Sequence, residues 1–150
     1  DVPSASLPEV SRPDGVRVRV VAGAAEGVPG AVKDIFAGPT YLDVALPAGR
    51  SFEQPVPKGH TALLYVFQGE VQVGRATAAR GAAIGAPRLV ILTDGDVVRV
   101  HADAAPARFL LLSAQPLGEP AVRYGPFVMN TQEEIAQALQ ELRDGTFIKG

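Results

Sequence analysis

Short apolar runs separated by glycine and proline are the feature that most constrains how this chain folds. Its 150 residues include 16 glycines and 13 prolines, which are spread between the runs instead of gathered in one linker. Residues 16–20, Val-Arg-Val-Arg-Val, alternate apolar and charged side chains, so the arginines are predicted to face away from a buried side. Such punctuation predicts many β-strands joined by turns.

The strands predicted from these runs are numerous and closely spaced. They cover residues 16–20, 41–46, 62–67, 70–73, 88–92, 97–100 and 108–112. Gln68 and Gly69 are predicted to make a tight hairpin between the third and fourth of them. The runs at 62–67 and 108–112 are too apolar to be half exposed, and they supply the predicted heart of the core: Leu64, Val66, Phe67, Leu110 and Leu112. Strands at this spacing are typical of an all-β antiparallel sandwich or barrel.

One helix is well specified near the end of the chain. Thr131 and Glu134 have the spacing of a capping box, and Gly145 supplies a stop signal. The apolar face of this helix carries few large side chains: Ile135, Leu139 and Leu142. A narrow apolar stripe predicts a helix that packs on the outside of the β-structure and does not bind a partner.

The predicted organisation is a single domain entered by an arm. Residues 1–15 contain three prolines and are predicted to form an extended arm or linker. Residues 16–130 form the predicted barrel, and residues 131–150 form a helix and tail packed on the same domain. The chain begins with Asp1 instead of methionine, which suggests processing or truncation.

Charge and composition exclude several classes of function. Lys and Arg number 14 against 16 Asp and Glu, so the net charge of −2 gives no reason to expect direct nucleic-acid binding. The absence of cysteine excludes disulfides and thiolate metal sites. No apolar stretch reaches the roughly 18 residues of a membrane span, and no signal segment opens the chain. The predicted location is the cytoplasm, without membrane association.

The run from Gly49 to Gly69 resembles the first metal-binding motif of the cupins. That motif reads G, five residues, H-x-H, three or four residues, E, six residues, G. Counted from Gly49, the histidine positions fall on Pro55 and Pro57, the glutamate position on Ala62 and the last glycine on Gly69. Both glycines are in register, and all three ligands are absent.

The second cupin motif carries the fourth metal ligand. When it is laid from Gly95, the metal histidine falls on Pro106. Proline and alanine side chains have no atom that coordinates a cation, whereas such sites need imidazole nitrogens and carboxylate oxygens. No metal site and no cofactor are therefore predicted in this chain.

Several stretches of the chain, within roughly residues 8 to 147, resemble the C-terminal domain of pirins. They are residues 20–23, 41–44, 47–49, 94–96 and 124–131, the last reading Tyr-Gly-Pro-Phe-Val-Met-Asn-Thr before the helix. The resemblance implies a bicupin whose N-terminal domain binds iron through three histidines and a glutamate, while its C-terminal domain usually binds none. It also implies links to quercetin 2,3-dioxygenase activity, transcriptional co-regulation and control of metabolic enzymes. No counterpart of the iron-binding domain occurs in these 150 residues.

The chain has two histidines, and they are the remaining candidates for chemistry. His60 precedes a predicted core strand. It could be a general base or a lone metal ligand at the barrel mouth, but the predicted role is that of a loop histidine hydrogen-bonded to the backbone. His101 ends a strand two residues before Asp103, and histidine titrates near neutral pH. Adjacent side chains of a strand point to opposite faces, and even His101 and Asp103 need not touch, so we do not expect an acid–base dyad there.

The sequence therefore predicts a non-catalytic cupin domain that is the structural and interaction partner of a metal-binding N-terminal cupin domain. Iron is expected only in that N-terminal domain, and a quercetin 2,3-dioxygenase-type activity only in a full pirin-like protein. A second copy of a cupin chain and a regulatory protein are the other predicted partners. Two alternatives stay open: a metal-free cupin isomerase or epimerase that uses one histidine as its base, and a regulatory module that binds a small molecule.

Overall fold

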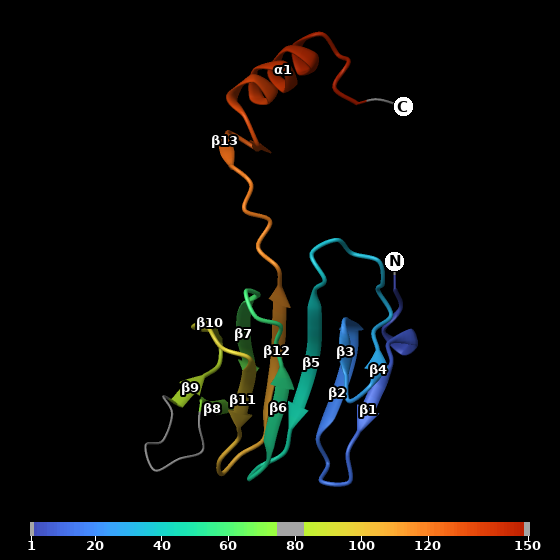
Figure 1. Ribbon diagram of the computed structural model, residues 1–150, viewed down its shortest axis with the longest axis vertical. Coiled ribbons are helices and arrows are strands. Elements are labelled where there is room, and N and C mark those ends of the chain that lie inside the picture. Colours follow the sequence, from blue (N-terminus) through green and yellow to red (C-terminus); the bar gives the residue numbers. More distant parts are fainter. Residues whose placement is uncertain (1, 75–82, 149–150) are drawn as a thin grey trace. The chain divides into compact units, whose positions relative to one another are not determined.

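Alternating side chains arrange the strands as two antiparallel sheets with an apolar core between them. The computed structural model describes residues 2–74 and 83–148 (Figure 1). One sheet has the order β1-β2-β5-β12-β7-β10, and the other has the order β6-β11-β8-β9. The predicted all-β antiparallel sandwich with one C-terminal helix is confirmed. Within the described residues the two sheets remain separate and do not close into a barrel.

The six-stranded sheet consists of β1 (Glu9–Ser11), β2 (Arg17–Ala22), β5 (Thr40–Leu46), β12 (Ala107–Ala114), β7 (Thr61–Gln68) and β10 (Arg88–Ile91). The four-stranded sheet consists of β6 (Ser51–Pro55), β11 (Val97–His101), β8 (Glu70–Val73) and β9 (Ala83–Gly85). A short ribbon joins β3 (Ala24–Ala25) to β4 (Val28–Pro29), and a single 3-10 turn, η1, covers Ser4–Ser6. Within the described residues, the pairings between these strands are antiparallel.

The core lies between the inward faces of the two sheets. Phe52 on β6 and Phe109 on β12 are both fully buried, and their ring centroids lie 6.0 Å apart, so they link one sheet to the other. Valines of the alternating run at 16–20 are completely buried, and Arg17 between them is exposed, as their pattern predicts. Apolar contact between the inward faces therefore holds the sandwich together.

Part of the predicted core is wrong. Leu64 and Val66 are fully buried, but Phe67, Leu110 and Leu112 lie half-buried on the opposite, outward side of the six-stranded sheet. The pairing of β12 with β7 explains the difference. Inward-facing side chains of one strand lie opposite inward-facing side chains of the other, and outward-facing side chains lie opposite outward-facing ones. Both strands are apolar on both faces, so their sequences do not show which face is inside.

The predicted hairpin at Gln68 and Gly69 is also wrong. The strand before it, β7, belongs to the six-stranded sheet, and the strand after it, β8, belongs to the other sheet. Gly69 has a φ of +74°, and a Cβ there would collide with the carbonyl oxygen of Pro106. Glycine is therefore required where the chain crosses between the sheets.

β6 and β1 are among the strands that the sequence pattern does not predict. β6 lies inside the motif run, where alternation is hidden by polar side chains on both faces, and β1 lies inside the predicted arm. β1 pairs with β2, and the Nε atom of Arg19 donates to the Glu9 carboxylate at 3.1 Å. This ion pair joins the edge strand to its neighbour.

The chain from Leu117 to Gly150 forms a second compact unit. It contains the ribbon of β13 (Val122–Tyr124) and β14 (Phe127–Met129), followed by α1 (Gln132–Arg143). The predicted capping box is confirmed, because the Thr131 hydroxyl accepts from the Glu134 amide while the Glu134 carboxylate accepts from the Thr131 amide. The first unit extends to Pro116, whereas the sequence placed residues 117–130 with the barrel. Packing of the helix on the sandwich stays a prediction.

The two faces of β12 provide the first test. Replacing Phe109 with alanine is expected to lower the free energy of unfolding by about 3–5 kcal/mol, because its ring is fully buried. Leu110→Ala is the matched control on the outward face, and we expect a loss of about 1 kcal/mol. Urea unfolding of both variants measures the difference. Equal losses would show that the inward and outward faces are wrongly assigned.

The ion pair on β1 provides a second test. Its hydrogen bond from Arg19 is the largest cause that lowers the pKa of Glu9. A lowered folded-state pKa stabilises the protein above the unfolded value of about 4.3, and this contribution disappears as the pH falls through the folded value. Glu9→Gln should therefore reduce the slope with which the free energy of unfolding rises with pH on the acid side. The reduction should be small, because the ion pair is exposed to solvent. An acid-side slope as steep as in the unsubstituted chain would contradict the role of this pair.

Candidate functional site

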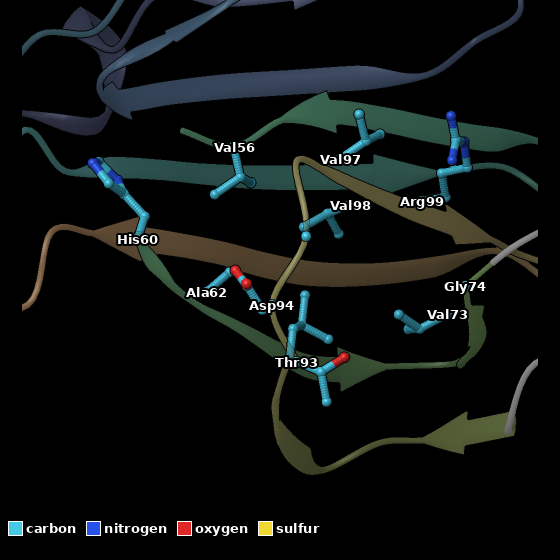
Figure 2. Close-up of a pocket in the computed structure, with 12 residues that line it drawn as sticks. Val56, His60, Ala62, Val73, Gly74, Thr93, Asp94, Val97, Val98 and Arg99 are labelled. Carbon is cyan, nitrogen blue, oxygen red and sulfur yellow. The ribbon is translucent and has the colours of Figure 1, made fainter. Parts of the chain in front are cut away.

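A pocket of about 270 Å³ opens between the two sheets (Figure 2). Its apolar lining includes Val56, Ala62, Val73 and Val98, and its polar lining includes His60, Thr93, Asp94 and Arg99. Figure 2 shows His60 at one end of the pocket, with Val73 and Arg99 toward the other. The pocket lies beside the segment that the first cupin motif covers, so it is where a metal would be sought.

The counted ligand positions do not form a metal site around this pocket. Pro55 and Pro57 are exposed, and the buried side chains beside them are Gln54 and Val56, one position earlier in each case. Strand alternation on β6 causes this, because every second side chain points inward. Ala62 is buried and lines the pocket, but it carries no donor atom.

Gln54 is the one polar side chain that β6 buries. Its Nε2 atom donates to the carbonyl oxygen of Ala24 at 3.1 Å and to that of Pro55 at 3.4 Å. These bonds use the amide to hold the β3 segment, so the side chain has a structural role. The sequence leaves open whether Glu53 or Gln54 faces the interior, because β6 was not predicted as a strand.

The position predicted for the fourth ligand is also outside the pocket. Pro106 is exposed in the turn before β12, and its carbonyl oxygen lies close to Gly69. Among residues 2–74 and 83–148, no group of three or more histidine, aspartate or glutamate side chains is placed to hold a metal ion. The described residues therefore do not fit the iron that the fold family implies.

Among the residues that the structure describes, His60 lies at the pocket without an acid–base partner. Its backbone amide donates to the Pro57 carbonyl oxygen at 3.2 Å, while its buried Nδ1 atom finds no hydrogen-bond partner in the described part of the chain. Asp94 and Arg99 line the same pocket, but no hydrogen bond or ion pair among the described residues joins either of them to His60. Arg99 is instead bonded to Glu53 at 2.8 Å.

His101 lies on the outward side of the four-stranded sheet. Its Nδ1 atom is 2.9 Å from the hydroxyl oxygen of Ser51, which is directly opposite on β6. The Asp103 carboxylate accepts from Gln72 at 3.4 Å, and no bond within the described residues joins it to His101. The structure therefore pairs His101 with serine across two strands and does not assemble the histidine–aspartate dyad.

The outward side of the six-stranded sheet carries an apolar strip that the sequence did not reveal. The strip consists of two rows of side chains, each with one residue from β12, one from β7 and one from β10, placed opposite one another by strand pairing. In that strand order, the first row is Leu112, Leu63 and Ile91, and the second is Leu110, Tyr65 and Leu89. Leu89 is 57% exposed and Ile91 is 71% exposed. We call these six residues the outer apolar strip. It was missed because apolar residues in both central strands were assigned to the core.

An apolar groove of about 500 Å³ continues this strip toward β5 and β2. Tyr41 lies opposite Leu112, and both line the groove together with Leu63, Ile35 and Pro39. The outward side near β1 and β2 is instead charged, with Glu9, Arg17 and Arg19 on it. One half of this face is thus suited to apolar contact and the other to ionic contact.

The two-sheet sandwich, the pocket between its sheets and the two glycines of the metal motif at its turns define a cupin domain. Gly49 and Gly69 both adopt positive φ angles, of 69° and 74°. The Pirin C-terminal cupin domain matches residues 41–148, and the chain belongs to the pirin family. The predicted resemblance is thereby confirmed.

Relatives of known description agree with this membership. A pirin-like protein of Caulobacter vibrioides is 42% identical over 143 residues, which cover 95% of this chain and 49% of the relative. Human pirin is 38% identical over 146 residues, covering 96% of this chain and 49% of the relative. The chain spans about half the length of the curated relatives it matches.

Two proteins described as quercetin 2,3-dioxygenases are also similar. A putative enzyme of this name from Pseudomonas aeruginosa is 39% identical over 150 residues, covering 97% of this chain and 51% of that protein. The crystal structure of quercetin 2,3-dioxygenase from Acinetobacter baumannii matches with a TM-score of 0.79 and 32% identity, covering 97% of this chain and 49% of that one.

In the described part of the present chain, no helix is long and apolar enough to cross a membrane.

The described residues place no set of metal ligands at the pocket, and this gives the third test. When the purified chain is loaded anaerobically with Fe(II) and desalted, elemental analysis is expected to find far less than one iron per chain, because even open metal sites usually keep three protein ligands. His60→Ala and His101→Ala should leave that value unchanged. Close to one tightly held iron, lost in either variant, would contradict the prediction.

Proposed function

We propose that this chain is the non-catalytic cupin half of a pirin-like protein and that it packs against a metal-binding cupin half. The observation that carries the proposal is the outer apolar strip, which leaves large side chains exposed on β7 and on the edge strand β10 and half-buried on β12. Monomeric proteins seldom expose contiguous apolar patches of this kind unless another surface covers them. The docking surface is therefore the outward side of β12, β7 and β10.

The chemistry of the outer apolar strip favours a protein partner over a small polar ligand. Leucine, isoleucine and tyrosine side chains form the strip, and they are the kind of residue found in the dry centre of interfaces. Arg108 lies on the same side next to Phe67, its guanidinium 5.0 Å from the ring centroid. Charged residues border the strip on the β2 side, as in the polar rim of an interface.

The partner that we propose is the cupin half that precedes this one in the relatives. The chain matches a C-terminal cupin domain and spans about half of each curated relative, so the other half of those proteins is available next to it. A second copy of this chain and a separate regulatory protein are the competing occupants. A cytoplasmic location is part of the same proposal.

The quercetin 2,3-dioxygenase activity in the names of two relatives is proposed only for the assembled protein. The pocket residues of this half provide no donor set for iron, so metal chemistry would reside in the other half. In that arrangement this chain supplies a packing surface and no reacting group. The isomerase alternative is not favoured, because His60 has no acidic partner at the pocket in the described residues.

A two-chain reconstitution tests this proposal. The present chain and the N-terminal half of its full-length protein, expressed separately and mixed, are expected to form an equimolar complex. Replacing Leu89 and Ile91 together with glutamate should weaken it by at least about tenfold, or ~1.4 kcal/mol, because two charges would be buried in an apolar interface. Both side chains are already exposed, so the isolated chain should keep its melting temperature.

Ala104→Glu is the matched control, since this exposed residue lies in the turn between β11 and β12, away from the strip. It should leave the dissociation constant unchanged. Flavonol cleavage is expected from the complex and not from this chain alone. A complex that tolerates both glutamates would contradict the docking surface, and a stable dimer of this chain alone, broken by the same glutamates, would assign the strip to a second copy.

A further inference from the structure

We propose that a hollow on the charged half of the six-stranded sheet binds a small organic carboxylate. The hollow measures about 230 Å³ and lies on the outward side, near the turns that enter β2 and leave β5. The residues that line it and carry the argument are Arg17, Arg108, Gln68, Ala45, Pro47 and Pro106. It is separate from the pocket between the sheets, and it does not depend on the docking of a partner.

Strand register places the polar groups around a gap. Ala45 on β5 lies opposite Arg17 on one side and opposite Arg108 on the other. Gln68 on β7 lies opposite Arg108 in the next position across the sheet. Two strand spacings separate the backbones of the two arginines, which is about 10 Å. The small alanine between them leaves room for a group that both guanidinium groups can reach.

Arg108 is held in place by two contacts. Its Nη2 atom bonds to both carboxylate oxygens of Asp43, at 2.9 and 3.2 Å, and its guanidinium lies over the Phe67 ring. Its Nε atom is shielded from solvent, so a ligand in the hollow would meet the terminal nitrogens of the guanidinium, whose side chain is 40% exposed. An ordered guanidinium is suited to anion binding, because little conformational entropy is lost when the anion arrives.

Arg17 supplies the second positive charge. It is exposed, and among residues 2–74 and 83–148 no hydrogen bond or ion pair engages its side chain. Nearby Arg19 is already paired with Glu9 at 3.1 Å, and Asp43 neutralises only one of the two arginines at the hollow. One positive charge therefore remains, and a monoanion balances it.

The walls of the hollow favour an organic carboxylate over phosphate. Pro47 and Pro106 present apolar surface, and the planar guanidinium group matches the geometry of a carboxylate. A cavity of about 150 Å³ accepts benzene, so the hollow has room for a single ring that bears a carboxylate. A phosphate dianion would instead leave a surplus negative charge beside Asp43.

Benzoate is the probe, and the 150-residue chain is titrated with it by calorimetry at low ionic strength. We expect saturable binding in the millimolar range, weakened at least about tenfold by Arg17→Ala because a charge-assisted hydrogen bond is lost. Arg19→Ala is the matched control, on the same strand and the same side, and it should change the affinity less than about twofold because Arg19 is already paired with Glu9. Benzyl alcohol and phosphate should each bind more weakly than benzoate.

Further arms separate the site from general attraction between charges. Ala45→Leu should abolish binding, because the leucine side chain fills the gap. If this variant fails to fold, Arg17→Ala still tests the site, because Arg17 is exposed and its replacement should not disturb folding. Repeating the titration with the chain bound to the N-terminal half distinguishes a free ligand, which still binds, from a carboxylate side chain of the partner, which excludes benzoate from the same site. Absence of benzoate binding to the chain alone, or equal weakening by Arg17→Ala and Arg19→Ala, would overturn the assignment, whatever the outcome for docking.

Discussion

Antiparallel pairing of β12 with β5 and β7 is the constraint on which the rest of this structure depends. β12 lies in the middle of the larger sheet, and its inward side chains meet the smaller sheet through Phe109 and Phe52. The same register decides what the outward side presents, because consecutive residues of a strand face opposite ways. A slip of one residue would bury the outer apolar strip and expose the phenylalanine core.

The cupin frame and a cupin metal site depend on different atoms, and the ligand positions counted from Gly49 carry no donor side chain. Gly49 and Gly69 are kept by backbone geometry, since both have positive φ angles and Gly69 has no room for a Cβ. Metal binding depends instead on donor side chains, and the inward positions near the motif carry the amide of Gln54 and the hydrocarbons of Val56 and Ala62. Proline and alanine at the counted ligand positions are therefore compatible with these turns and with the sheet pairing.

The outward side of the larger sheet combines two kinds of surface on one rigid support. Apolar side chains cover β12, β7 and β10, while charged side chains surround β1, β2 and β5. The apolar half is suited to a large, dry contact, and the hollow between Arg17 and Arg108 is suited to a single anionic group. Both proposed interactions therefore lie on the outside of the sandwich and not in its interior.

The sequence by itself determined the family, the all-β class, the capping box of α1 and the absence of ligands from the counted motif. These properties are local: they depend on residue type, on spacing and on turn chemistry. Only the tertiary structure decided that β7 and β8 lie in different sheets, that Gln54 and Val56 face inward, and that Leu110 belongs to an exposed strip. Strands that are apolar on both faces fit either orientation, and the pairing of residues far apart in the chain selects one. The row from Arg17 through Ala45 to Arg108 is created in the same way, by register across three strands separated in sequence.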